Sequence, residues 1–289
     1  MKYVPKEIEE EVNVTPVHPL MNFVQLLVTV ALIGGAIYWS LGWAADWLAL
    51  RLSPEMEMKI GQQLLPAVVE EAQIAESVQD RRLQYLTELA NSLRPSGKLQ
   101  EIPVKIYILP HEEPNAAILP GGHMLVTEGL LDTSESENEL AFVLAHELGH
   151  LEARDPLKGL GRSLVFLAAS AVVGASTADV GGVPQAVPLT GNLTNLHYSR
   201  QQESAADRYA LEAVMQWYQH GGNSLDFFVR SQARDWPVEV TGSEYFQTHP
   251  LTKKRIATLE ALANEKGWPM EGEVTPLPQN FACPNLKPC

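Results

Sequence analysis

The feature that most constrains the fold of this chain is an uncharged run of 25 residues, from Met21 to Ala45. As a helix, the run would extend about 37 Å, which exceeds the roughly 30 Å hydrocarbon core of a bilayer. Aromatic side chains gather at its far end, where a helix would meet lipid headgroups: Tyr38, Trp39, Trp43 and Trp47. We therefore predict an exposed tail at residues 1–20 and a single transmembrane helix at residues 21–50.

Two other interpretations of the uncharged run are open. It could be a cleaved signal peptide, because Ala44-Ala45 offers small residues, but the tail before it is long and more acidic than basic. It could also be a buried core helix, although 25 residues without a charge are many for one. Basic residues flank the run equally and give no orientation; they are Lys2, Lys6, Arg51 and Lys59.

The net charge of −14 limits the possible partners. Binding to nucleic acid needs clustered lysine and arginine side chains, so we expect no nucleic-acid partner. The only two cysteines, Cys283 and Cys289, cannot form a zinc site of paired cysteines. They could form a disulfide in an oxidising compartment, which favours an extracytoplasmic side for the large C-terminal part, or they could remain free thiols.

Helical and strand patterns follow the run and predict an α+β fold that is mostly helical, with a small sheet. Apolar spacing predicts four helices, at residues 54–94, 136–154, 200–219 and 251–265. Alternating residues predict three strands, of which the last two flank a Pro-Gly-Gly turn as in a hairpin: residues 102–109, 116–119 and 123–127. We expect one domain at residues 51–265 and a proline-rich, irregular tail at residues 266–289.

An HExxH motif, His146 to His150, lies in the clearest of these helices. Residues four apart share one helical face, so His146 and His150 can bind one metal ion, which we expect to be zinc. Glu147 lies beside them and can act as general base on a metal-bound water. The alternative is a surface helix that carries two histidines by chance. The unbroken apolar residues 141–145 favour a buried helix, where unpaired histidines would be costly.

A zinc site of this kind needs a third protein ligand, and few candidates are present. The metzincin pattern is excluded because Ala153 and Pro156 occupy its Gly and His positions. In the segment that follows, up to Glu203, the only histidine is His197, and Asp179 lies in a glycine-rich stretch with no helix to hold it. We therefore favour Glu203, which lies near the start of a capped helix.

Asp207 lies one turn after Glu203 and would face the same side of that helix. A carboxylate there can accept the free N–H of a ligand histidine and fix its tautomer. The alternative for this segment is a solvated helix face, because Arg200 and Arg208 stand close to the two acidic residues.

Together these motifs resemble the zinc metallopeptidase family that includes the CAAX prenyl protease and the bacterial heat-shock protease HtpX. The matching residues occur in the family's order: Asn115-Ala116, Leu119-Pro120-Gly121-Gly122, Gly129-Leu130-Leu131, His146–His150, Arg200–Asp207 and Thr248-His249-Pro250.

The resemblance implies a zincin-like fold of the gluzincin type, with Glu203 as third zinc ligand and with Asp207 and Arg200 close to the ligands. It implies that Asn115 and Ala116 belong to an edge strand on which substrate docks by backbone pairing. It also implies that His249 stabilises the tetrahedral oxyanion. From its position alone, His249 could equally be a residue that precedes a helix.

A second uncharged stretch, Ser163 to Ala178, follows the motif. If it crossed a membrane once, His150 and Glu203 would lie on opposite sides and the zinc site could not form. The residues after it contain several glycines and prolines and would make a poor spanning helix. We expect a core or interfacial helix near the site. The chain also lacks the many spans of the prenyl protease, which argues against CAAX processing.

These expectations favour a membrane-anchored zinc endopeptidase that cleaves unfolded or exposed segments of proteins, in protein quality control. The alternative is a membrane-tethered chaperone or adaptor that binds zinc but cleaves little. The intact Glu147 argues against it, as does the three-ligand pattern, because structural zinc normally has four protein ligands. A peptidase that captures a chain terminus is a third possibility and would need a charged pocket.

Overall fold

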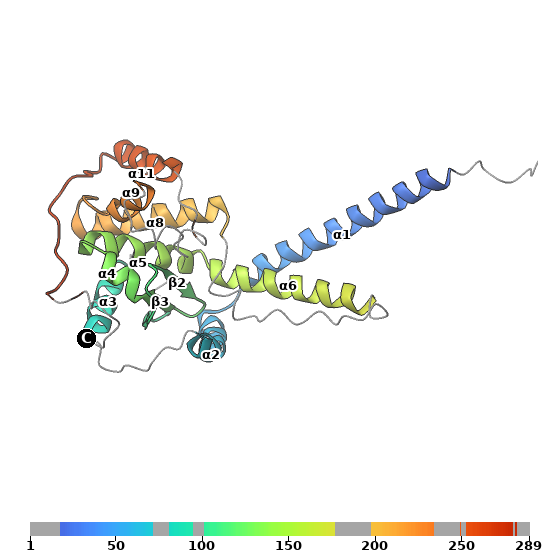
Figure 1. Cartoon of the computed structure of the whole chain (residues 1–289), viewed down its shortest axis with the longest axis horizontal. Helices are drawn as coiled ribbons and strands as arrows, with labels where there is room; N and C mark the ends of the chain where they lie inside the picture. Colours follow the sequence, from blue (N-terminus) through green and yellow to red (C-terminus); the bar gives the residue numbers. More distant parts are fainter. Residues whose placement is uncertain are drawn as a thin grey trace, which may run out of the picture. The chain divides into compact units, whose positions relative to one another are not determined.

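A computed structural model of the chain describes residues 18–71, 81–94, 101–176, 198–233, 249, 253–279 and 281 (Figure 1). The chain divides into two compact units, Met1–Ala44 and Ala45–Cys289. The tail expected at residues 1–20 lies outside the described residues except for its last three, and both cysteines also lie outside them.

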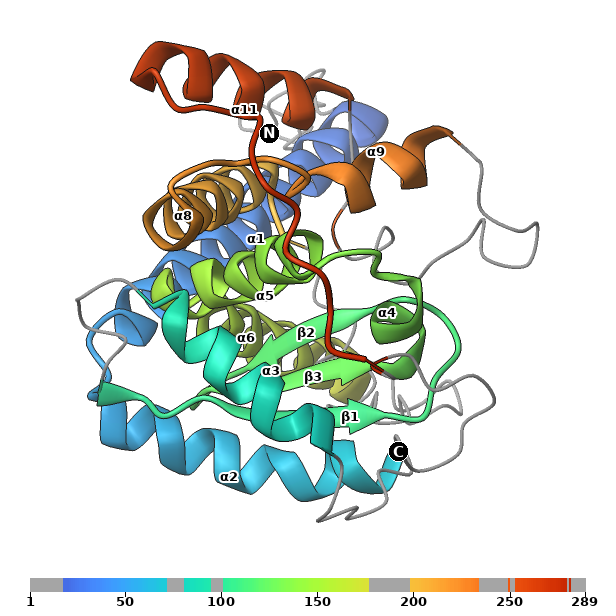
Figure 2. The same ribbon diagram turned by 90° about the vertical axis from the view of Figure 1, so that its left-hand side faces the viewer.

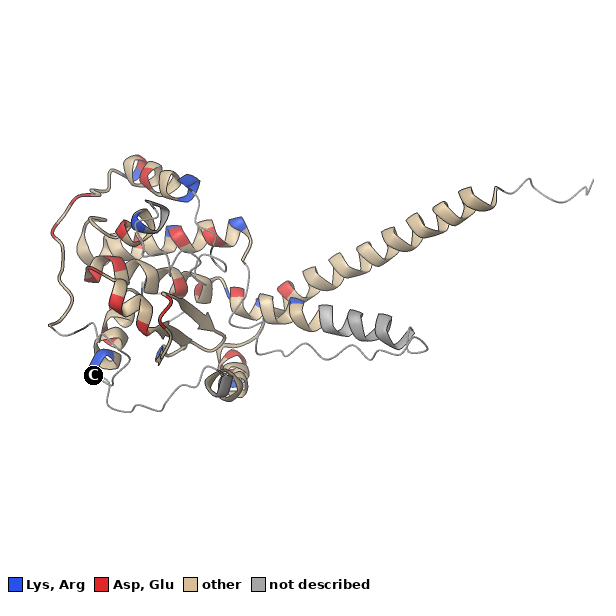
Figure 3. Cartoon of the chain, in the orientation of Figure 1, with Lys and Arg blue, Asp and Glu red and all other residues tan. Residues whose placement is uncertain are grey.

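The first unit is dominated by one long helix, α1 (Pro19–Ala49), whose last turn belongs to the second unit. It carries no charged side chain before Asp46 (Figure 3). The helix is long and apolar enough to cross a membrane, and none of its most apolar window is buried. The predicted membrane helix is thus present as a helix, and none of the residues in its most apolar window is buried in the described chain.

The second unit contains a sheet of three strands, β1 (Lys105–Leu109), β2 (Ala116–Leu119) and β3 (His123–Thr127). Their order is β1-β3-β2, with β1 parallel and β2 antiparallel to β3, so the predicted hairpin is confirmed. The turn needs its glycines, because Gly121 and Gly122 have φ angles of 79° and 81°. Among the described residues, β2 is therefore an edge strand.

Eight helices of the second unit are described. They are α2 (Pro54–Glu71), α3 (Arg81–Ser92), α4 (Glu128–Thr133), α5 (Glu137–Glu152), α6 (Asp155–Ser176), α8 (Arg200–Tyr218), α9 (Asp226–Ala233) and α11 (Lys253–Lys266). With the small sheet, they confirm the predicted α+β fold that is mostly helical.

One boundary differs from the prediction: the single helix expected at residues 54–94 is described as two helices, α2 and α3. The HExxH helix ends at Glu152, close to the predicted residue 154, and Asp155 and Pro156 form the first turn of α6, where the missing N–H of proline costs no hydrogen bond. Arg154, between the two helices, has a positive φ of 56°.

Helix α5 lies between the sheet on one side and α8, α9 and α11 on the other (Figure 2). Its N-terminus is capped by Ser136, whose hydroxyl accepts a hydrogen bond from the backbone of Glu139 at 3.3 Å. Every residue from Asn138 to Leu151 is buried. The sheet packs on α5 through Ile118, and its opposite face is covered by α2 and α6.

The predicted irregular tail is irregular but packed where it is described (Figure 2). The backbone of Glu137 donates a hydrogen bond to the carbonyl of Thr275 at 2.9 Å, and the backbone of Thr275 donates to Asn138 Oδ1 at 2.8 Å. Phe281 is buried against Tyr85, with ring centroids 5.3 Å apart. This segment therefore completes the start of α5.

Candidate active site

Helix α5 presents its two histidines to one point. His146 and His150 are fully buried, and their Nε2 atoms lie 3.2 Å apart. The i, i+4 spacing brings the two rings together on one face, with an edge-to-face angle of 85°. If Nδ1 carries the proton in both rings, the two Nε2 atoms are both acceptors and cannot form a hydrogen bond with each other. They therefore need a shared partner, such as a metal ion.

Glu203, in the first turn of α8, supplies a carboxylate to both histidines. Its Oε2 lies 3.5 Å from His146 Nε2, and its Oε1 lies 3.4 Å from His150 Nε2. The start of α8 is fixed by a complete capping box between Ser199 and Gln202. Gly149 allows the close approach of the two helices, because a Cβ there would lie 2.9 Å from Ala206 Cα.

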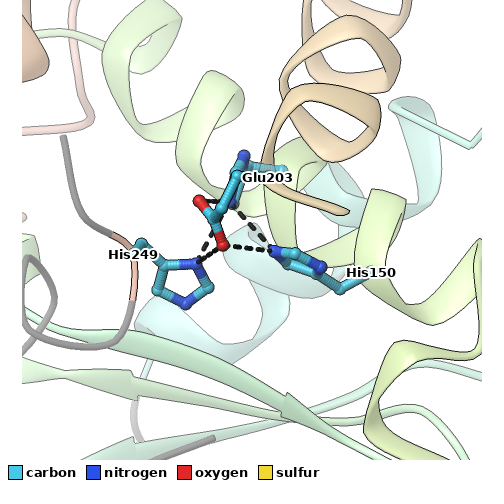
Figure 4. A group of neighbouring side chains, drawn as sticks. His150, Glu203 and His249 are labelled. Atoms are coloured by element: carbon cyan, nitrogen blue, oxygen red, sulfur yellow. Dashed lines mark hydrogen bonds and ion pairs between the residues drawn. The ribbon is translucent and has the colours of Figure 1, made fainter. Parts of the chain in front are cut away.

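His249 joins the same group from a segment far along the chain. Its Nδ1 lies 2.9 Å from Glu203 Oε1 and 3.3 Å from His146 Nε2. His150, Glu203 and His249 turn toward one another from three parts of the chain (Figure 4). With His146 they form a buried group whose ligand atoms all lie within 4.8 Å of one another.

The group fits a zinc ion by its donors and by its spacing. Tetrahedral zinc with ligands at 2.0–2.1 Å separates neighbouring ligand atoms by roughly 3.3–3.4 Å. Five of the six separations within the group run from 2.9 to 3.5 Å, and no two ligand atoms are more than 4.8 Å apart. Burial raises the pKa of the Glu203 carboxyl, but its contacts with His146, His150 and His249 outweigh this and bring the pKa far below its usual range. Glu203 is therefore an anion, as a metal ligand must be.

Two further carboxylates hold the outer nitrogens of the histidines. Asp207 Oδ1 lies 3.1 Å from His146 Nδ1, and Asp155 Oδ2 lies 3.1 Å from His150 Nδ1. Each carboxylate fixes the tautomer that leaves Nε2 free to bind a metal. Asp155, only five residues after His150, was not among the site residues expected from the sequence.

The arginine that contacts Glu203 and Asp207 is Arg255 of α11 and not Arg200. Arg200 is exposed at the first position of α8. Arg255 is buried. Its Nη1 forms an ion pair with Glu203 Oε2, and its Nη2 donates a hydrogen bond to Asp207 Oδ1, each at 2.7 Å. The basic residues that follow His249 were a visible signal for Arg255, but they did not show which of them turns inward.

Tyr198 is a second residue that sequence reasoning missed. Its ring stacks on His150, with centroids 4.0 Å apart and planes at 18°, and it also faces His249 at 5.5 Å. It directly precedes the Ser199 cap, so the capping box places it beside the ligands.

Glu147 lies next to the ligands and is not fixed by a close hydrogen bond among the described residues. Both of its carboxylate oxygens are buried, and neither takes part in a hydrogen bond with the described residues. His249 Nε2 lies 3.6 Å from its Oε1. Burial raises the pKa of the Glu147 carboxyl, while His249 and His146 lower it. A buried carboxyl with a raised pKa and no close hydrogen bond is suited to accept a proton.

The edge strand β2 passes beside this carboxylate, because the backbone of Ile118 interacts with Glu147. Before β2, the Asn115 backbone is held by Thr127, whose Oγ1 accepts from Asn115 N at 2.7 Å. Asn115 Oδ1 is buried and has no hydrogen-bond partner among the described residues. Ala116 is buried and pairs with Val126. The structure thus brings Asn115 and Ala116 to the sheet edge nearest the site.

Comparison with known proteins agrees with this arrangement. The chain is 28% identical over 181 residues to the mitochondrial metalloendopeptidase OMA1 of Schizosaccharomyces pombe, covering 61% of this chain and 51% of that protein. It is 28% identical over 195 residues to a protease HtpX homolog of Campylobacter curvus, covering 55% of this chain and 68% of that protein. It is 25% identical over 194 residues to the beta-barrel assembly-enhancing protease of Escherichia coli, covering 63% of this chain and 39% of that protein.

The similarity to OMA1 thus spans about half of that relative's length. The sequence model of peptidase family M48 matches residues 78–263, which is more than half of the 289 residues. The match contains the HExxH helix, Glu203 and His249. This chain therefore belongs to peptidase family M48.

Proposed function

We propose that the protein is a membrane-anchored zinc endopeptidase that hydrolyses peptide bonds in unfolded or exposed segments of proteins. One observation carries the proposal: a buried group of metal-binding side chains stands beside Glu147, whose carboxylate has no hydrogen bond with the described residues. A structural metal site has no use for a buried carboxylate of this kind, whereas hydrolysis needs a base beside the metal.

The roles of the residues follow from their positions. His146, His150 and Glu203 would hold the ion, and Asp207 and Asp155 would keep the two histidines in the required tautomer. Zinc, when bound, would polarise the scissile carbonyl and make water a better nucleophile at neutral pH. Glu147 would take a proton from the attacking water and deliver it to the leaving amide nitrogen.

His249 is proposed to stabilise the oxyanion. In the arrangement described, its Nδ1 lies among the ligand atoms and its Nε2 faces Glu147. A substrate carbonyl needs room between Glu147 and the ligands, so the His249 ring has to turn aside as substrate enters. Once it has turned aside, the His249 ring can donate a hydrogen bond to the oxygen of the attacked carbonyl.

Substrate is proposed to bind as an added strand along β2. An edge strand offers backbone groups that pair with any extended chain, so recognition would depend little on sequence. Asn115 Oδ1 is available to accept a backbone N–H of the substrate. Only segments that are unfolded or exposed can be extended in this way, which suits a role in protein quality control.

Helix α1 is proposed to span the membrane once, with the catalytic unit on the extracytoplasmic side. Its exposed apolar side chains support the span. The extracytoplasmic side is favoured by Cys283 and Cys289, because a disulfide between them would persist only in an oxidising compartment.

The test is proteolysis of a permanently unfolded protein by the full-length chain in detergent, with Glu147→Gln as the variant and with equal zinc content in both. We expect cleavage by the native chain and a loss of about 10²–10⁴-fold in the variant, as for removal of a general base. A zinc-loaded native chain that cleaves no more than the variant would identify the chaperone or adaptor alternative instead.

A further inference from the structure

Arg255 contacts both Glu203 of the metal-binding group and Asp207, which lies behind His146. It lies in the first turn of α11, and its side chain is only 9% exposed. Its Nη1 forms an ion pair with Glu203 Oε2, and its Nε and Nη2 donate hydrogen bonds to the two carboxylate oxygens of Asp207, all three at 2.7 Å. A fourth contact of 3.4 Å runs from Nη1 to the backbone carbonyl of His249.

The two oxygens of Glu203 have different partners. Oε2 forms the ion pair with Arg255 and lies 3.5 Å from His146 Nε2, and Oε1 faces His150 and His249. A carboxylate that is fixed at one oxygen can present the other in a single direction. The planar guanidinium suits this task because it offers several donors in a rigid fork, which the point charge of lysine does not.

Arg255 also reaches the HExxH helix through Asp207. The Oδ1 atom that accepts from Arg255 Nη2 is the same atom that faces His146 Nδ1 at 3.1 Å. One side chain is thus linked to three of the four metal-binding residues: to Glu203 directly, to His146 through Asp207, and to His249 through its backbone.

The charges of Glu203, Asp207 and Arg255 also favour a metal ion beside the histidines. Glu203 and Asp207 are both buried, and both contact the guanidinium of Arg255. Two buried carboxylates with one guanidinium leave a single net negative charge toward the histidines, which favours a divalent cation there.

We propose that Arg255 is a positioning residue that orients Glu203 and the His249 backbone and thereby sets the zinc affinity of the site. This role rests on the proposed function only in taking zinc as the bound ion. Arg255 touches neither substrate nor metal in this assignment. The competing explanation is that it merely joins α11 to α8 and stabilises the fold.

The decisive variant is Arg255→Lys in the full-length chain, which keeps the charge and removes the fork. Arg230→Lys is the matched control, because Arg230 of α9 makes a comparable contact with the buried Glu139 of α5, outside the metal-binding group. Zinc affinity is measured by competition with a chromophoric chelator, and unfolding by denaturant is measured with excess chelator present.

We expect Arg255→Lys to weaken zinc binding by about 10–100-fold, the usual effect of losing a residue that orients a metal ligand. Arg230→Lys should leave zinc affinity within about twofold of the native value, since it touches no ligand. Equal zinc affinities in the two variants would overturn the positioning role, whatever their effects on unfolding. If Arg255→Lys does not fold, Arg255→Gln, which keeps a planar donor but loses the charge and the fork, decides in the same assay, with the same 10–100-fold expectation and the same contrary result.

The zinc measurement uses no substrate, so it separates this inference from the proposed function. A native chain that binds zinc but cleaves nothing would contradict the endopeptidase and leave the positioning role supported by the affinity difference.

Discussion

Helices α1 and α5 are both rich in apolar residues, yet they meet opposite environments. In α1 the large apolar side chains are exposed, with Leu32 at 68% and Trp39 at 79%, whereas in α5 every residue from Asn138 to Leu151 is buried. Between Met21 and Ala45, α1 has no charged group, while α5 carries Glu139, His146, Glu147 and His150 in its buried part. A helix buried by protein can hold polar groups because neighbours satisfy them, and a helix for lipid cannot.

The largest expected effect, on zinc content and proteolysis, comes from replacing a buried polar residue of α5 by an apolar one of the kind that α1 carries. His150→Leu removes a metal ligand while Asp155 keeps its contact with Lys158 Nζ at 2.9 Å. We expect the loss of stoichiometric zinc and at least ~10³-fold less proteolysis, with the fold retained. Elemental analysis and circular dichroism check this prediction. Full zinc occupancy in the folded variant would contradict the assigned ligand set.

A pair of phenylalanine substitutions tests the difference in burial. Phe142 in α5 is 0% exposed, and Phe23 in α1 is 57% exposed. Phe142→Ala should lower the free energy of unfolding of the catalytic unit by about 3–5 kcal/mol, because it opens a cavity in the core. Phe23→Ala should leave it unchanged. Denaturant titration in detergent measures both, and similar losses would show that α1 is a core helix.

A charge introduced into α1 tests its proposed lipid environment. Leu32→Arg places a cation near the centre of the run and should disfavour membrane insertion by about 2.5–3.5 kcal/mol. The fraction extracted by alkaline carbonate should rise, with zinc content unchanged. Unaltered membrane retention of this variant would remove the spanning role from α1.

The smallest effect concerns two glycines. A Cβ at Gly149 would lie 2.9 Å from Ala206 Cα, whereas one at Gly34 of α1 would meet nothing within 4 Å. Gly149→Ala should therefore destabilise the catalytic unit by about 1–3 kcal/mol through overpacking. Gly34→Ala should have no destabilising effect on that unit. Thermal unfolding of the two variants measures the contrast, and equal midpoints would mean that α8 can shift away from α5 without cost.

The local parts of the fold and site could be predicted from the sequence. The HExxH spacing, the Ser136 cap and the Pro-Gly-Gly turn each act over a few residues, and the structure has the expected helix and hairpin. Glu203 and Asp207 lie one helical turn apart, so their common face also followed from local geometry.

The parts that failed depend on long-range packing. Arg200 was expected near the ligands because it is close to Glu203 in sequence, but the first position of α8 faces outward. Arg255 occupies that place from 48 residues beyond Asp207, a pairing that no local pattern encodes. The short helix α9 was missed for the same reason, because the burial of Phe227 and Phe228 in the core decides its place.

The packing of the C-terminal segment on α5 has a consequence for biosynthesis. Helix α1, the proposed anchor, is made before His249 and Arg255, and Thr275 is made later still. A nascent chain therefore holds α1, the sheet and the HExxH helix before it holds a complete metal-binding group or the residue that closes the start of α5. The proposed insertion of α1 and the completion of the metal-binding group are thus separated in time by the order of translation.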